Sequence, residues 1–260
     1  MRRFPRTPSL MVNSVQSGPE QPKPVAGYPP RDFKFLAMNF AVRLMPTGWK
    51  YWGNSILLKT SIGDGGPINV PEPYSWTWAG PEEIDYLDRH PEATSPTAYA
   101  RRAARGDRCL CIKQGSEVVG YRWFKLGTGC ILCGFGPDME ITLFPLKPGQ
   151  AFSYDLFTYR KYRGQGFATL LNNLLYHALR EEGIKEVLAL VSPANHAALR
   201  LNLRFGALPQ RLVYSYRIRG WSKTFLGPEG DRRLIEWTQQ FKSNLTPGLS
   251  HTNRAGRNQA

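Results

Sequence analysis

The residues RGQGFA, at positions 163–168, have the composition of an anion-binding turn. Basic side chains surround the two glycines, and a run of leucines at helical spacing follows directly. A helix that begins near Gln165 presents backbone N–H groups without intrahelical partners, and its dipole places partial positive charge at the same end. Phosphate oxygens reach those amides where no Cβ intervenes, as at Gly164 and Gly166, and Arg163 adds a charge-assisted contact. The spacing therefore favours a pyrophosphate ligand.

Two other phosphate-binding motifs do not fit this stretch. A P-loop requires GKS or GKT, and a dinucleotide-binding turn requires a third glycine. The residues after Gly166 supply neither. For this one motif taken alone, a tight strand-to-helix turn without a ligand stays open as the alternative.

The segments on both sides of the turn have the patterns of regular elements. Residues 151–159 read as a strand. After the turn, apolar residues recur at helical spacing and predict a helix that ends at Gly183: Phe167, Leu170, Leu171, Leu174, Leu175, Ala178 and Leu179. The same pattern places a polar set on the opposite side of that helix, namely Asn172, Asn173, His177 and Arg180.

The order of the remaining elements predicts the fold class. Residues 184–191 read as a strand buried on both faces, and Ser192 with Pro193 is expected to cap a helix that stops at Gly206. Further strands are expected at 55–61, 74–78 and 210–219, with a hairpin over 108–126 and short helices around 81–89 and 95–106. This order predicts an α+β fold, with a mixed, mostly antiparallel sheet and helices on both faces.

Composition divides the chain into five parts. Residues 1–30 and 246–260 are rich in small, polar and Pro residues and are expected to be a disordered N-terminal arm and a disordered tail. Residues 31–73 are expected to form an extension packed on the core, and residues 226–245 a short C-terminal helix. The domain that carries the chemistry is expected to span residues 74–225.

Two blocks together resemble the GNAT superfamily of acyl-CoA N-acyltransferases. The run RGQGFA resembles the family signature R-x-x-G-x-G/A, with a strand before it and a helix after it. The block VSPANHAALRLNLRFGA, residues 191–207, resembles the downstream strand-to-helix segment of the family. The resemblance covers residues 75–218 and is sharp from Asp155 to Gly206.

The resemblance implies acetyl-CoA, or another acyl-CoA, as co-substrate. The fourth and fifth core strands of the family separate, and pantetheine lies between them. Here the backbone of Phe157, Thr158 and Tyr159 would pair with it, and the pyrophosphate would lie on the amides of Gly164, Gln165, Gly166, Phe167 and Ala168 beside Arg163. Asn195 would contact the cofactor from the other side of the cleft.

The implied reaction is direct attack of a primary amine on the thioester, which needs a base, oxyanion stabilisation and a proton for the thiolate. A backbone N–H near Leu156 or Phe157 can stabilise the oxyanion. Asp155 and Glu140 are the candidate bases. Asn202 occupies the position where many relatives have a tyrosine, and asparagine has no titratable proton. Water, the product amine, Tyr214 or Tyr216 would then protonate the thiolate.

The four cysteines have the spacing C-x-C and then C-x-x-C, which fits a zinc ribbon only in part. Cys109 and Cys111 lie in a predicted strand, where both point to one face, and no histidine is near. We therefore expect free, reduced core cysteines and no metal, with a zinc site as the alternative.

The composition is that of a globular protein with a basic surface. Of the 260 residues, 42% are hydrophobic, which is enough for a sizeable core, and the formal net charge is +14. The basic residues are spread over separate segments, which favours a solvated surface over a nucleic acid partner. The sequence contains neither a long apolar run nor a signal peptide pattern, so a cytoplasmic location is expected.

The sequence is therefore consistent with two alternative functions. The first is an enzyme that transfers an acetyl or related acyl group from acyl-CoA to an amine acceptor not identified by the residues. The alternative is a catalytically idle relative whose basic surface binds RNA, a ribosome or an anionic membrane. The absence of clustered aromatic residues among the basic ones favours the enzyme.

Overall fold

The computed structural model describes residues 50–92, 98–127, 130–134, 140–218 and 221–244. The N-terminal arm and the C-terminal tail expected from the sequence lie outside the described residues. The strands are β1 Lys50–Ser61, β2 Tyr74–Trp78, β3 Arg108–Gln114, β4 Glu117–Lys125, β5 Cys130–Gly134, β6 Glu140–Pro145, β7 Gln150–Thr158, β8 Glu186–Val191, β9 Leu208–Ile218 and β10 Trp221–Leu226. The helices are α2 Pro81–Arg89, α3 Ala98–Ala104, α4 Phe167–Glu181, α5 His196–Arg204 and α6 Arg232–Ser243, with a 3₁₀ turn at Arg160–Tyr162.

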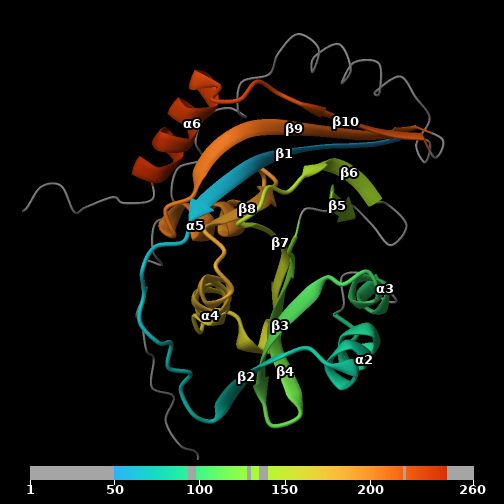
Figure 1. The fold of residues 1–260 in the computed structure, drawn as a ribbon, viewed down its shortest axis with the longest axis vertical. Helices are drawn as coiled ribbons and strands as arrows, with labels where there is room; N and C mark the ends of the chain where they lie inside the picture. The colour runs from blue at the N-terminus through green and yellow to red at the C-terminus, as the bar shows by residue number, and fades with distance from the viewer. Residues whose placement is uncertain (1–49, 93–97, 128–129, 135–139, 219–220, 245–260) are drawn as a thin grey trace, which may run out of the picture.

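The main sheet confirms the predicted fold class. Its eight strands have the order β10-β9-β1-β8-β7-β4-β3-β2, and β5 and β6 form a separate two-stranded sheet. Only β7 and β8 pair in parallel within the main sheet, because α4 provides the crossover that a parallel connection needs. Helix α4 lies on one side of the β3, β4 and β7 strands, and α2 and α3 lie on the other side (Figure 1).

Strand β1 is part of the main sheet and is not packed on the outside of it. It lies between β8 and β9, with Ile56 opposite both Val191 and Leu212. The apolar side chain of Ile56 is fully buried there, in a cluster shared with α5 and α6. The extension expected over residues 31–73 therefore contributes an interior strand.

Strand β10 was not predicted from the sequence. It pairs with β9 at the end of the sheet, from Trp221 opposite Ile218 to Leu226 opposite Val213. Phe225 and Leu226 are more than a third exposed, so the part of this strand whose side chains are described lacks the buried face that makes a strand recognisable. The C-terminal helix was predicted, and α6 lies within the expected range.

The predicted polar side of α4 is wrong at one position. Asn172 is fully buried, and Asn173, His177 and Arg180 are half-buried. The buried face of α4 is therefore wider than the leucine pattern indicates. Near the end of the helix, the Arg180 guanidinium donates hydrogen bonds to the carbonyl oxygens of Gly63 and Gly65, which holds that loop against α4. A local period cannot show which loop covers a helix.

The cap of α5 also differs from the prediction. Asn195 is the N-cap, and its Oδ1 accepts a hydrogen bond of 3.1 Å from the Ala198 N–H. Ser192 lies one turn earlier, where its carbonyl oxygen accepts the Asn195 N–H. Asparagine is as good an N-cap as serine, so composition alone does not distinguish the two positions.

Candidate functional site

The parallel strands β7 and β8 separate along their length. They pair from Gln150 opposite Glu186 to Ser153 opposite Ala189. Beyond that pair β7 continues to Thr158 and β8 to Val191, but the two strands no longer pair with each other. The backbone of Asp155 has a φ of 46°, and the register of β7 with β4 shifts at this residue. This β-bulge bends β7 away from β8.

A cavity of about 760 Å³ occupies the space between the separated strands. Its walls come from β7, from the end of β8, from the first turn of α4 and from one side of α5. Among the residues predicted from the sequence, it is lined by Asp155, Phe157, Thr158, Arg163, Ala168, Asn195 and Asn202. Residues as far apart in the sequence as Asp155 and Asn202, which are 47 positions apart, thus line one cavity.

The turn at residues 164–166 presents unpaired backbone donors. None of the backbone N–H groups of residues 164–168 donates a hydrogen bond to a described residue. The φ angles of Gly164 and Gly166 are 78° and 86°, in the left-handed region that glycine adopts without strain. A Cβ at either position would meet no protein atom within 4 Å. The glycines are therefore required by the backbone conformation, which aims the amides outward.

Arg163 is held at the mouth of the cavity. Its Nε donates a hydrogen bond of 2.9 Å to the carbonyl oxygen of Thr158, and its guanidinium lies 5.3 Å from the centre of the Phe157 ring. The side chain is exposed. It therefore adds a positively charged, solvent-accessible group beside the unpaired amides of the turn.

Alternate residues of β7 direct their backbone hydrogen-bonding groups toward the cavity, along the edge of the strand that no longer pairs with β8. The Tyr159 N–H donates to the Val119 carbonyl oxygen, and Phe157 lies opposite Tyr121 on the same partner strand. Because hydrogen-bonding groups alternate along an antiparallel strand, those of Leu156 and Thr158 point to the opposite edge. Leu156 and Thr158 are thus the residues of this segment whose backbone groups can meet an extended ligand.

Tyr159 does not line the cavity. Its ring is buried and packs against His90, with ring centres 4.0 Å apart. Burial raises the pKa of the Tyr159 phenol. Its backbone N–H is used by the Val119 carbonyl oxygen, so the predicted contact of Tyr159 with the cofactor is available neither to this N–H nor to the side chain. Gly164, Gln165, Gly166 and Phe167 also lie outside the cavity lining, at its open end.

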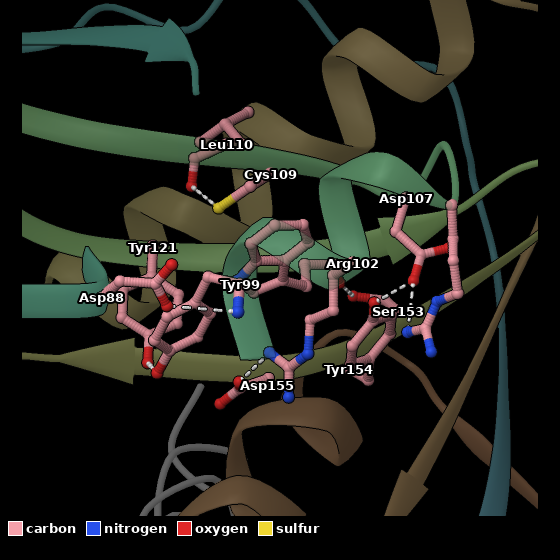
Figure 2. Close-up of polar contacts among 12 residues, drawn as sticks. Asp88, Tyr99, Arg102, Asp107, Cys109, Leu110, Tyr121, Ser153, Tyr154 and Asp155 are labelled. Atoms are coloured by element: carbon pink, nitrogen blue, oxygen red, sulfur yellow. Dashed lines mark hydrogen bonds and ion pairs between the residues drawn. The ribbon is translucent and has the colours of Figure 1, made fainter. Parts of the chain in front are cut away.

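Asp155, one candidate base, is ion-paired. Its Oδ2 accepts from Nη1 of Arg102 in α3, and both side chains are mostly buried (Figure 2). The guanidinium also lies 5.5 Å from the Trp123 ring centre and 5.2 Å from that of Tyr154. Burial acts to lower the pKa of Arg102, but the Asp155 carboxylate outweighs it and the pKa is raised.

The other catalytic candidates lie in different places. Asn202 is buried in the cavity wall, with Nδ2 donating to the Ala198 carbonyl oxygen at 2.8 Å and with no partner for Oδ1 among the described residues. Glu140 is the first residue of β6 in the separate sheet, and its side chain lies outside the described part of the chain. Tyr214 packs in the core beneath α5 and does not line the cavity.

Sequence reasoning missed several cavity residues, among them Arg122, Ser153 and Tyr154. Arg122 of β4 is 3% exposed, and its Nε donates to Ser153 Oγ at 2.5 Å. The Tyr154 hydroxyl donates to Asp107 Oδ2 at 2.7 Å, and burial raises its pKa. The sequence did contain a signal for Arg122, because it is an arginine within the apolar run VVGYRWF. A charged residue in a buried strand is rare and indicates a special role.

The cysteines of β3 lie together. Cys109 and Cys111 are buried and free, with their sulfurs 3.8 Å apart on one face of the strand. Burial raises the pKa of the Cys109 thiol well above its ordinary value. The residues that the structure describes contain no group of three or more His, Cys, Asp or Glu able to hold a metal ion. In the same residues, no helix has the length and apolar content to cross a membrane.

Comparison with known proteins gives one family match. The family model described as "Acetyltransferase (GNAT) family" matches residues 71–207, which is more than half of the chain. A comparison with curated proteins found no match.

Comparison with solved structures gives several matches. A Drosophila protein has a TM-score of 0.50 and 13% identity, over 73% of this chain and 59% of that one. A tandem GNAT protein from the clavulanic acid biosynthesis pathway has a TM-score of 0.48 and 22% identity, over 81% and 63%. A GNAT-family protein from Novosphingobium aromaticivorans, described as a putative acetyltransferase, has a TM-score of 0.45 and 16% identity, over 72% and 70%. The chain spans less than two thirds of the length of the first two.

Proposed function

The chain belongs to the acetyltransferase (GNAT) family, and from this premise we propose that it transfers an acetyl or related acyl group from acyl-CoA to a primary amine by direct attack. The separation of β7 and β8 beyond Ser153 and Ala189, which opens a cavity next to unpaired amides, is the observation that carries the proposal. An extended thioester cofactor with an anionic end matches both features.

The cofactor would lie along the free edge of β7. Its diphosphate would accept hydrogen bonds from the amides of residues 164–168, with Arg163 alongside. Its pantetheine arm would pair with the backbone of Leu156 and Thr158, in the place of the missing strand. Asn195 caps α5 through Oδ1, which leaves its Nδ2 as a donor on the opposite wall.

The reaction needs no covalent enzyme intermediate. The amine nitrogen forms a bond to the acyl carbon, the carbon–sulfur bond breaks, and the thiolate leaves with a proton lost by the amine. The Leu156 N–H would stabilise the oxyanion, because it lies on the cavity edge of β7. This donor comes from the backbone and requires no particular side chain.

We assign the base to Asp155 acting through water. It is the candidate whose carboxylate lies in the cavity wall, and Oδ1 has no hydrogen-bond partner among the described residues. The Tyr154 hydroxyl donates its hydrogen bond to Asp107, and burial raises the pKa of this phenol. Asn202 has no titratable proton. The proton lost by the amine would therefore reach the thiolate through water.

The proposal is tested by binding and by turnover. Isothermal titration with CoA and acetyl-CoA should give saturable binding. Thiol release in a mixed pool of amino acids, amino sugars, polyamines and lysine peptides, followed by mass spectrometry, should give an amide product of a primary amine. No binding of CoA would contradict the whole proposal. Binding without thiol release for any acceptor would support a catalytically idle protein.

A further inference from the structure

Arg122 places a positive charge at the closed end of the cavity. Ser153 belongs to the last parallel pair between β7 and β8, and Arg122 Nε donates to its hydroxyl. Both side chains line the cavity, and both are at least 97% buried, with exposed fractions of 3% and 1%. Arg163 lies at the opposite end of the cavity, beside the amides of the turn.

The Arg122 guanidinium has no counter-ion among the described residues. The bond to Ser153 is its only hydrogen bond to a described residue, and the buried Nη1 has no partner at all there. Burial lowers the pKa of Arg122, and the phenol of Tyr176 in α4 is the only described group that acts to raise it. Arg102, in contrast, is paired with Asp155, which raises its pKa.

Such a group is costly in a folded protein. A buried charge without a partner destabilises the fold, because its lost hydration is not replaced. An arginine is suited to carboxylate recognition, because its planar fork donates two parallel hydrogen bonds. The free donors of Arg122 therefore match a carboxylate that enters the cavity from outside.

We propose that Arg122 selects acyl-CoA donors whose acyl group ends in a carboxylate, that is, monothioesters of short dicarboxylic acids. This inference rests on the proposed function. The cofactor would run from the amides of the turn along β7, so its acyl group would be the last part and would reach the closed end at Ser153. There Arg122 meets the acyl end of the donor, and the carboxylate is a spectator while the carbon–sulfur bond breaks and the amide bond forms.

Binding of matched thioesters tests this without knowledge of the acceptor. Malonyl-CoA, succinyl-CoA and isovaleryl-CoA are titrated calorimetrically, with free CoA as the reference. Isovaleryl-CoA has the shape of malonyl-CoA, with two methyl groups in place of the two carboxylate oxygens. We expect malonyl-CoA or succinyl-CoA to bind about 10- to 100-fold tighter than isovaleryl-CoA, the range typical of a hydrogen-bonded charged group.

Substitution of Arg122 should remove the preference and leave the fold intact. Arg122→Met should bind the three thioesters with similar affinity, and Arg122→Lys should restore part of the preference. The melting temperature of Arg122→Met should be equal to or above that of the wild type, because a buried unpaired charge is removed. Arg232→Met, on the exposed face of α6, controls for the loss of one positive charge.

The outcomes separate this inference from the proposed function. Equal affinity of the wild type for malonyl-CoA, succinyl-CoA and isovaleryl-CoA, with CoA still bound, overturns the inference and leaves acyl transfer standing. The same holds if Arg122→Met keeps the wild-type preference for malonyl-CoA or succinyl-CoA over isovaleryl-CoA. Failure of CoA itself to bind overturns the proposed function as well.

Discussion

Arg102 of α3 and Asp155 at the bulge of β7 form an ion pair that joins the helix to the edge of the cavity. Asp155 has a φ of 46°, which aspartate tolerates better than most side chains. The pair therefore fixes the backbone at the point where β7 bends. It also holds the carboxylate that we propose as the base.

Asp155→Asn should separate the structural and the chemical role of this carboxylate. Asparagine keeps the size and tolerates the same φ, but leaves Arg102 unpaired, so unfolding free energy should fall by about 2 kcal/mol or more. If Asp155 is the base, kcat should fall about 10²- to 10⁴-fold. Arg102→Met is the matched control, since it breaks the same pair and keeps the carboxylate. Equal losses of kcat in the two variants would show that the pair acts only through structure.

Alanine at Gly164 or Gly166 should weaken CoA binding. Both residues have positive φ angles, so alanine costs about 1–2 kcal/mol of stability at each and turns the amides away from the ligand. Gly183→Ala is the control, because Gly183 has a φ of 75° at the other end of α4. All three variants should melt lower in calorimetry, but only the first two should lose affinity for CoA. Unchanged affinity in the first two would place the diphosphate elsewhere.

Glu83 should contribute stability that depends on pH. Its carboxylate bonds Lys113 Nζ at 2.6 Å and the Gly80 N–H at 2.9 Å. The hydrogen bond from Lys113 lowers the pKa of Glu83 below its ordinary value of 4.5, against the opposing effect of burial. A carboxyl group with a lowered pKa in the folded state stabilises the fold above the unfolded pKa, and this stability is lost as the pH falls through the folded pKa.

Urea unfolding of Glu83→Gln measures that contribution. At pH 7 the variant should be less stable than the wild type by about 1 kcal/mol. The difference should shrink below pH 4.5, where the wild-type carboxylate takes up its proton. Glu82→Gln, on the exposed side of the same helical turn, should show little change. A difference that stays constant down to pH 3 would mean that charge is not its source.

Truncation before and after β1 tests its place in the fold. A chain that starts at residue 46 keeps β1 and should fold, whereas a chain that starts at residue 63 loses the strand between β8 and β9. The second should fail to give a cooperative thermal transition, because the backbone groups and apolar faces of both neighbours become unpaired. A cooperative transition in the shorter chain would support an acyltransferase domain of residues 74–225 that folds without the extension.

The sequence by itself determined the elements whose signals are local. Each of these signals lies within one short stretch: the period of α4, the apolar run of β8 and the glycine turn between β7 and α4. With the order of the other elements, they predict the fold class and the position of the anion-binding turn. The left-handed φ of Gly164 and Gly166 is a property of the turn itself. Short-range steric rules are enough to read such features.

The tertiary structure alone decided the contacts between distant segments. Arg102 and Asp155 are 53 positions apart, and no pattern in the sequence shows that α3 lies over the bulge of β7. The same is true of β1 between β8 and β9, and of Arg122, whose lack of a counter-ion among the described residues depends on all the elements packed around it. Charge pairing and burial are set by packing between elements, and local periodicity carries no information about which elements meet.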